Sequence, residues 1–447
     1  MLLLSDDGHS NEALRAVDRV PRVVPGATTL VSVAIYFANF GISKAAAYLA
    51  PLVLAAYLDS SSYGIIEYAW SWSALVATLL TLGIPGALPQ LSLLRRPVPM
   101  VDVMALCVAG PGALLTAAAV IAIAVAHSPA QAVVLSACVI ALAQVMLSSH
   151  SRTFSHRNLA LWFEGLSIYG MTAIALSLAV VGLTGVSPLG ILSGVVAAII
   201  VIIALTLFAR LRHTEFLVRL RSAVRIGLPL LAFTLSSIWA AVSGRVYIGA
   251  LLPIEDLSVY SVDFRIASAM LIMHSIVATG LFARLYSMPS RLYDRFLSFY
   301  LAAIAMLAVA IVASYPFLVG YLQFRSLGTD NIHTAVGLFP IVMLQVYAWG
   351  AWASLEIRLA RTRRSAPAAR RSIVLMVAVA ALLVGLGMRG LLSLRVCAML
   401  VALQMIGGVA IQLRTLWRRG AKMPRTAAAY IFGVVLITLC GWFIRTI

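Results

Sequence analysis

The chain has 447 residues, of which 62% are hydrophobic and only 11% are charged, and its mean hydropathy is +1.01. A soluble domain has about half its residues apolar and a quarter charged, so the composition excludes that class and predicts a polytopic membrane protein. The net charge of +18 does not indicate a nucleic-acid partner, because the arginines lie in short blocks between apolar runs.

Apolar runs long enough to cross a bilayer, which takes about 20 helical residues, follow one another along the chain. The thirteen candidate spans cover residues 27–57, 63–84, 100–126, 130–149, 160–183, 186–209, 226–252, 257–283, 296–315, 336–355, 372–387, 391–413 and 426–444. We therefore predict an all-α polytopic membrane protein.

The longest basic connection divides the spans into two groups. Residues 1–26 form a tail without the apolar core and cleavage site of a signal peptide. Residues 27–209 are predicted to form an N-lobe of six spans, 210–225 a basic linker helix on the membrane surface, and 226–413 a C-lobe of six spans. Residues 414–447 are predicted to add a basic loop and a thirteenth span.

The basic residues alternate with the spans. If the N-terminus is cytoplasmic, 26 of the 33 basic residues fall in cytoplasmic loops and four fall in loops on the other side. This bias is the one that sets orientation in membrane proteins. The outer loops are short, so we expect the protein to act within the bilayer.

No catalytic or metal-binding motif occurs in the sequence, and no cofactor is expected. The four cysteines all fall inside apolar runs and form no CxxC pair, so we expect small buried hydrophobes and neither a disulfide nor a metal site. The absence of a Walker A sequence argues against an ATP-driven pump.

Three basic residues lie within predicted spans: Lys44, Arg245 and Arg265. A charge at the centre of a membrane helix costs at least about 2.5 kcal/mol, so it usually serves a function. Lys44 lies near the middle of its span and is one of only two lysines among the 33 basic residues. Arg245 follows a Ser-Gly pair that leaves room for another group, although its stem could also reach the outer headgroups.

Glu67 lies about one turn into the second span. It is either an interfacial carboxylate or the partner of Lys44 or Arg245, whose burial penalty it would lower. Aromatic residues near the ends of spans, Tyr63, Trp70 and Tyr260 among them, are expected to form an interfacial belt.

Asp263 and Arg265 are two positions apart in one span, so they point to different faces of a helix and each is expected to find a partner elsewhere. His274, in the middle of the same span, either carries protons or hydrogen-bonds a neighbour. Glu67, Asp263 and His274 are thus the candidate counter-ion or coupling residues.

An internal sequence repeat supports two related halves. Leu54, Tyr63 and Gly83 recur as Leu251, Tyr260 and Gly280, each pair separated by 197 positions. Parallel repeats of this kind place the substrate site of a transporter between its halves.

Two stretches resemble a known family. The first stretch contains three motifs: Leu54-Ala-Ala-Tyr-Leu-Asp59, Tyr63-Gly64 and Leu82-Gly-Ile-Pro-Gly-Ala-Leu88. The second stretch contains Gly227-Leu-Pro229, Gly244-Arg-Val-Tyr-Ile-Gly249 and Val259-Tyr-Ser-Val262. They resemble the polysaccharide-transporter branch of the MOP superfamily, the Wzx-type flippases of lipid-linked oligosaccharides. Such proteins often have Asp-Arg where this chain has Gly244-Arg245, so Glu67 or Asp263 would have to replace that carboxylate.

The resemblance implies two pseudo-symmetric six-helix lobes around a central cavity that opens alternately to either side. The implied substrate is an undecaprenyl-diphosphate-linked oligosaccharide, moved to the periplasmic leaflet of the bacterial inner membrane by a multi-pass protein with a cytoplasmic N-terminus. Cationic cavity residues would receive its diphosphate, and Lys44, Arg245 and Arg265 are the candidates here. Membrane lipids and other polysaccharide-assembly proteins are the expected partners of a monomer that binds no nucleic acid.

Two alternatives remain open. A drug or metabolite antiporter of the related MATE type would favour acidic cavity residues, whereas the buried set here is mainly basic. A membrane-embedded glycan polymerase or ligase would need a large outer loop with catalytic groups, which this sequence lacks.

Overall fold

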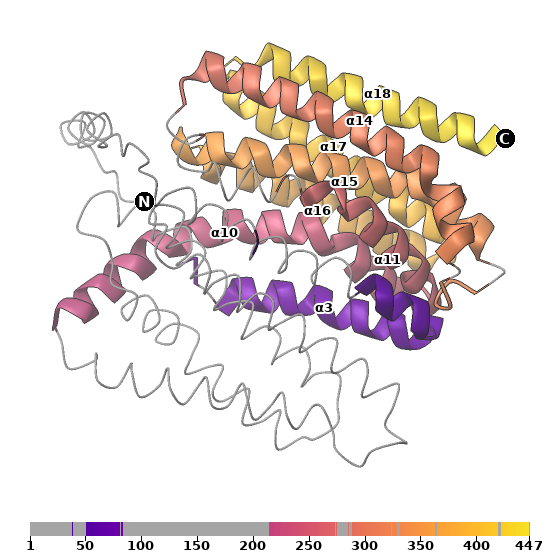
Figure 1. Cartoon of the computed structure of the whole chain (residues 1–447). Coiled ribbons are helices and arrows are strands. Elements are labelled where there is room, and N and C mark those ends of the chain that lie inside the picture. The colour runs from indigo at the N-terminus through magenta and orange to yellow at the C-terminus, as the bar shows by residue number, and fades with distance from the viewer. Residues whose placement is uncertain are drawn as a thin grey trace.

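The computed structural model describes residues 38, 51–80, 82–83, 214–272, 274, 285, 288–322, 324–328, 331–362, 364–418 and 422–446. The described elements are all helices. Figure 1 shows them as a stack of rods, with α3 at one side, α14 and α18 at the other, and the remaining helices between them.

Helix α3 (Ser60–Leu80) begins at a side-chain cap. The backbone N–H of Ser62 donates to Oδ2 of Asp59 at 3.0 Å, which satisfies one of the free donors of the first turn. This hydrogen bond lowers the pKa of Asp59, which lies in the connection before the helix.

Two helices pack on α3. Helix α10 (Thr214–Leu251) includes most of the predicted linker and continues without a break into the seventh predicted span. The segment after α3 and helix α10 come close together at Gly83 and Gly227, where a Cβ on Gly83 would overlap the carbonyl of Gly227. Gly83 also has φ +71°, a conformation that favours glycine. Helix α11 (Ile254–Ser268) contacts both α3 and α15.

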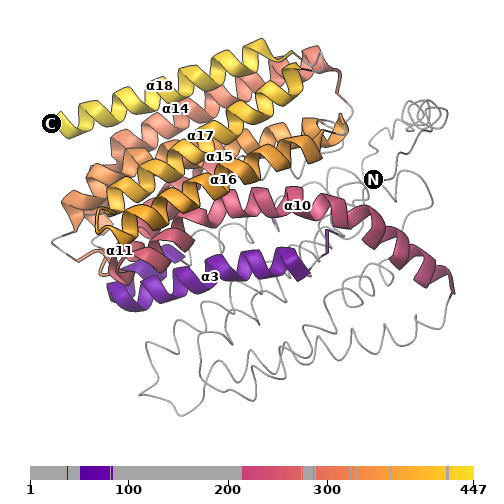
Figure 2. The same cartoon turned by 180° about the vertical axis from the view of Figure 1, so that it is seen from behind.

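The centre of the described bundle is α15 (Ile332–Arg361), which contacts α10, α11, α14, α16, α17 and α18. Trp352 on this helix is 1% exposed. Helix α14 (Ser290–Leu322) packs along α18 (Pro424–Thr446), and Figure 2 shows these two side by side from behind. Asp294 joins them, since its Oδ1 accepts from the Thr426 N–H at 2.9 Å and from the Thr426 hydroxyl at 2.7 Å.

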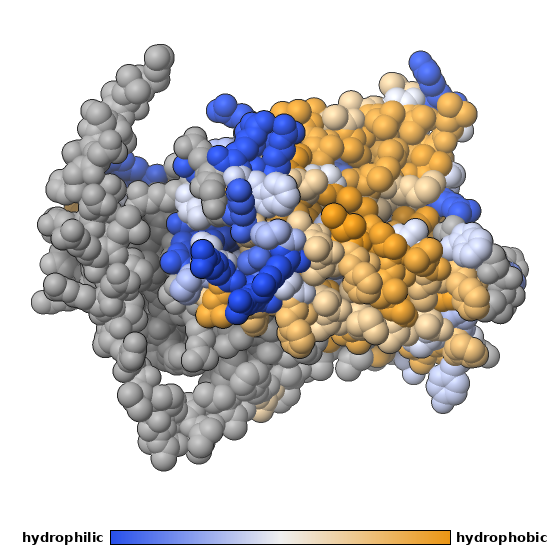
Figure 3. All heavy atoms as spheres, turned by 90° about the horizontal axis from the view of Figure 1, so that it is seen from above, coloured by the Kyte–Doolittle hydropathy of each residue, from blue (hydrophilic) through white to orange (hydrophobic). Residues whose placement is uncertain are grey.

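Helices α16 (Ser365–Met388) and α17 (Leu394–Trp417) complete the described part. Apolar side chains on α14, α16 and α18 face outward, including Val374, Phe299 and Phe432. Figure 3 shows one such face as an apolar band, with hydrophilic residues gathered mainly at one end. A surface of this kind is the one a bilayer covers.

Six helices in the described part are long and apolar enough to cross a membrane. They are Leu230–Leu251, Ser290–Leu322, Ile332–Arg361, Ser365–Met388, Leu394–Trp417 and Pro424–Ile444. The chain is therefore an all-α, multi-span membrane protein. The division into two six-helix lobes extends over residues outside the described ranges and stays a prediction.

Helix ends differ from the predicted spans. The predicted span 296–315 stops before a proline, whereas α14 starts at Ser290 and continues through Pro316 to Leu322. Helix α15 likewise contains Pro340 and extends past the apolar run to Arg361. Hydropathy detects only the segment inside the hydrocarbon, and membrane helices tolerate proline where neighbours satisfy the freed backbone groups.

Candidate functional site

The carboxylate of Glu67 on α3 lies at the centre of a buried ion cluster and is 1% exposed. Its Oε2 accepts from NH1 of Arg245 on α10 at 3.0 Å. Arg265 on α11 donates from Nε to Oε1 at 2.8 Å and from NH2 to Oε2 at 2.9 Å. One carboxylate therefore holds two guanidinium groups that come from two other helices.

Aromatic rings cover both arginines of the cluster. The Cζ atom of Arg265 lies 4.8 Å from the ring centroid of Trp70, and that of Arg245 lies 4.6 Å from the centroid of Phe264. Such cation–π contacts compensate in part for lost hydration. Both arginines are buried, at 6% and 7% exposure.

The hydroxyl of Tyr63 completes the shell around Glu67. It donates to Oε1 at 3.2 Å, and Tyr63 is fully buried one helical turn before the carboxylate. Among the described residues, the cluster thus combines two positive charges with one negative charge. In the described part of the chain, Nε of Arg245 has no hydrogen-bond partner.

A buried cation excess is costly in an apolar bundle. Breaking a buried ion pair by removing one partner costs about 3–5 kcal/mol, because the other charge stays desolvated. With two guanidinium groups and one carboxylate among the described residues, the cluster has the chemistry to accept an anion as a further partner.

Asp263 lies on the same helix as Arg265 but belongs to a different contact. Its Oδ1 accepts from the hydroxyl of Tyr315 on α14, and its Oδ2 has no partner among the described residues. Tyr315 stacks on Phe339 with ring centroids 3.6 Å apart. Asp263 is fully buried. Among the described residues it shares no hydrogen bond with the arginine cluster.

Further polar pairs connect α10 and α11 to the centre of the bundle. Tyr260 donates to Oε1 of Gln345 on α15, and Nε2 of Gln404 on α17 donates to the Ser243 hydroxyl at 3.3 Å. In the described ranges, Nε2 of Gln345 and Oε1 of Gln404 remain without partners. Both atoms are buried within the bundle.

The structure brings together three of the predicted site residues, Glu67, Arg245 and Arg265. Of the possible partners of Glu67, it shows Arg245, and it adds Arg265. His274 is elsewhere, with its Nδ1 3.0 Å from the Tyr300 hydroxyl and 3.4 Å from that of Ser354. Lys44 lies outside the described residues.

Sequence reasoning missed several members of the site. The sequence predicts Tyr63, Tyr260 and Trp70 near the ends of spans, and the structure adds that Tyr63 and Tyr260 are completely buried and that Trp70 packs on Arg265. For Tyr63 a signal existed, since it precedes Glu67 by four residues and so shares its helix face. No sequence signal indicated Tyr315, whose partner comes from another helix.

The internal sequence repeat includes two serines beside this site. Ser71 donates to the carbonyl of Glu67 at 2.8 Å, and Ser268, 197 positions later, donates to the carbonyl of Phe264 at 2.5 Å. Helices α3 and α11, which carry the two copies, pack against each other.

Among the described residues, no group of three or more His, Cys, Asp or Glu side chains is placed to hold a metal ion. Cys397 and Cys440, the two cysteines in these ranges, are free thiols.

Comparison with known proteins gives a likeness to solved structures but none to curated sequences. No protein-family model matches the chain, and no curated protein sequence matches it. The fold is similar to the crystal structure of the eukaryotic MATE transporter AtDTX14, at 12% sequence identity and a TM-score of 0.43. The likeness covers 96% of this chain and 94% of that transporter.

Proposed function

We propose that the chain is a flippase that moves an undecaprenyl-diphosphate-linked oligosaccharide from the cytoplasmic to the periplasmic leaflet of a bacterial inner membrane. The observation that carries the proposal is the buried Glu67–Arg245–Arg265 cluster, in which two guanidinium groups share one carboxylate among the described residues. A diphosphate is the anionic part of such a lipid, and guanidinium groups bind phosphate oxygens through charge-assisted hydrogen bonds.

The cluster is suited to exchange its anion. Glu67 comes from the proposed N-lobe, and both arginines come from the proposed C-lobe. A phosphoryl group that enters between the lobes would replace the carboxylate as the acceptor for Arg245 and Arg265. Substrate binding then releases α3 from α10 and α11, and this couples the diphosphate to a change between inward-facing and outward-facing states.

Lys44 is the third cation of the proposed site. The lysine is expected in the N-lobe, where it would contact the diphosphate from the side opposite Arg245. The neutral polar atoms of Gln345 and Gln404 supply hydrogen-bond partners of the kind that sugar hydroxyls need.

Deletion of the gene tests the proposal directly. We expect the lipid-linked oligosaccharide to accumulate in the cytoplasmic leaflet, as measured by extraction and mass spectrometry. Wild-type protein should restore export, and Arg245→Gln should restore less than about one tenth of it at equal abundance. Arg389→Gln is the matched control, since Arg389 is exposed at the end of α16 and should leave export unchanged.

A deletion strain without such accumulation would refute the proposal. So would full export by Arg245→Gln together with Arg265→Gln at normal protein abundance.

A MATE-like, ion-coupled exporter of small molecules is the second candidate, and Asp263 is the observation that favours it. Its buried carboxylate, held by Tyr315, resembles a proton- or cation-binding group. Under that alternative, Asp263→Asn abolishes transport and the deletion strain becomes sensitive to cationic drugs. Under the flippase proposal, Asp263→Asn retains glycan export and drug sensitivity stays unchanged.

A further inference from the structure

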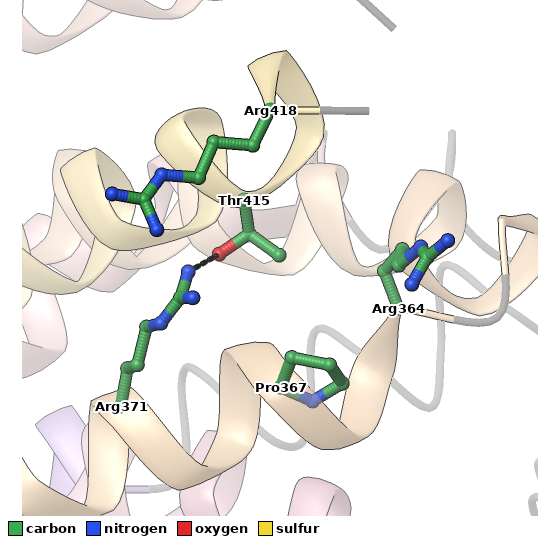
Figure 4. A pocket seen from close by; sticks show the side chains of 5 residues that line it. All are labelled: Arg364, Pro367, Arg371, Thr415 and Arg418. Carbon is green, nitrogen blue, oxygen red and sulfur yellow. Dashed lines mark hydrogen bonds between the residues drawn. The ribbon is translucent and has the colours of Figure 1, made fainter. Parts of the chain in front are cut away.

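A second basic site lies between α16 and α17, on helices that carry no member of the ion cluster. A pocket of about 420 Å³ is lined by Arg364, Pro367 and Arg371 from the start of α16 and by Thr415 and Arg418 from the end of α17. Figure 4 shows the guanidinium groups of Arg371 and Arg418 near Thr415, with Arg364 across the pocket.

The arginines of this pocket keep most of their donors free. NH1 of Arg371 donates to the Thr415 hydroxyl at 3.1 Å, and that hydroxyl in turn donates to the carbonyl of Ile411 at 2.7 Å. Thr415 thus fixes the direction of Arg371 and leaves its other N–H groups available. Within the described ranges, the side chains of Arg364 and Arg418 have neither an ion pair nor a hydrogen-bond partner.

The sequence around the two helices of the pocket is strongly basic. The 91 residues that follow Glu356 contain 14 arginines and lysines and no aspartate or glutamate. Two guanidinium groups held beside one hydroxyl repel each other, so an external anion would relieve the repulsion.

The surroundings of the pocket point to a lipid as the source of that anion. One face of α16 carries a stripe of exposed residues spaced three or four positions apart: Pro367, Arg371, Val374, Ala378 and Leu382. From Arg371 to Leu382 the stripe rises about 16 Å, close to the thickness of one leaflet of the hydrocarbon core. A phosphoryl headgroup in the pocket would place its acyl chains along this stripe.

We propose that Arg371 and Arg418, with Arg364 at the rim, bind the phosphoryl group of an anionic membrane phospholipid. Basic pockets between membrane helices near the interface bind anionic headgroups in this way. The site is separate from the transport site and does not depend on the proposed substrate.

Purified protein in a neutral detergent tests the site. Dioctanoyl-phosphatidylglycerol is expected to raise the thermal-unfolding midpoint, whereas dioctanoyl-phosphatidylcholine and inorganic phosphate are not. In Arg371→Gln/Arg418→Gln the apparent affinity for phosphatidylglycerol should fall by about tenfold or more. Native mass spectrometry should show one phosphatidylglycerol fewer on this variant.

The matched control is Arg389→Gln/Arg395→Gln, which removes the same charge from the opposite ends of the same two helices, where both arginines are exposed. It should bind like wild type. An equal response to phosphatidylcholine or to inorganic phosphate would overturn the lipid assignment, and so would an equal loss of binding in both double variants. If the double variant does not fold, Arg418→Gln alone should lower lipid retention in the mass-spectrometric assay, and unchanged retention would refute the site.

Discussion

Glu67 and Arg265, 198 positions apart in the chain, form a bidentate pair with N–O distances of 2.8 and 2.9 Å. The planar carboxylate and the planar guanidinium match each other in two parallel hydrogen bonds, which is the strongest geometry available to such a pair. Because α3 and α11 each bring one partner, the contact joins the proposed lobes through the interior of the bundle.

Replacement of Glu67 by glutamine should destabilise the protein strongly. The variant retains the shape of the side chain but leaves Arg245 and Arg265 buried without a negative charge. The expected loss is about 3–5 kcal/mol. Thermal unfolding of detergent-purified protein, followed by loss of the monodisperse chromatographic peak, measures it.

A double-mutant cycle separates this effect from simple loss of packing. Arg265→Gln added to Glu67→Gln removes a cation together with its partner, so the double variant should lose less stability than the sum of the two single variants. Additive losses would contradict an ionic contact at this position.

Replacement of each arginine by lysine should give unequal effects. Arg265 makes two hydrogen bonds to Glu67, whereas Arg245 makes one. Lysine preserves the charge but not the planar fork, so Arg265→Lys should lower stability by about 1 kcal/mol more than Arg245→Lys. Equal unfolding midpoints for the two variants would show that the bidentate geometry contributes little.

Adjacent glycines on α17 provide a packing test with an internal control. A Cβ on Gly408 would overlap the ring of Trp352, which is buried at the centre of α15. A Cβ on Gly407 would meet only the flexible end of Leu375, at 3.0 Å. We expect Gly408→Ala to cost about 1–3 kcal/mol and Gly407→Ala to cost much less, as measured by thermal unfolding. Two equally stable variants would mean that α15 and α17 are less closely packed than described.

The cap of α3 predicts a pH dependence. The backbone N–H of Ser62 lowers the pKa of Asp59 in the folded protein, so this carboxylate stabilises the fold above its unfolded pKa of about 3.9. The contribution is lost as pH falls through the lower, folded-state pKa. Asp59→Ala should therefore cost about 0.5–1 kcal/mol at neutral pH, and the difference from wild type should shrink in acid. A difference that is independent of pH would indicate that the charge of Asp59 does not contribute.

Much of the helical architecture can be predicted from hydropathy alone. The apolar runs 372–387, 391–413 and 426–444 correspond to α16, α17 and α18. The ends of the helices cannot be found this way, because residues such as Arg361 and Ser290 extend a helix beyond the hydrocarbon, where apolar character no longer selects them.

The individual charges of the site could also be found, because Arg245, Arg265 and Glu67 are conspicuous in apolar helices. The sequence does not determine which of these charged side chains form ion pairs. The choice between Lys44 and Arg245 as the partner of Glu67, and the additional pairing with Arg265, depend on how α3, α10 and α11 are rotated against one another. A hydropathy pattern with few polar residues does not determine that rotation. The same holds for Asp263, whose contact with Tyr315 joins two helices that sequence reasoning treated separately.

The paired serines bear on the history of the site. With the 197-residue offset that relates Tyr63 to Tyr260 and Ser71 to Ser268, Glu67 corresponds to Phe264 and Tyr68 corresponds to Arg265. The Tyr and Ser positions match at this offset, while the positions that form the ion cluster differ. Phe264 faces Arg245 through its ring, so a carboxylate in its place would have made the cluster neutral. Among the described residues, the two related stretches thus share Tyr and Ser at matching positions and differ at the positions that carry the charges of the ion cluster.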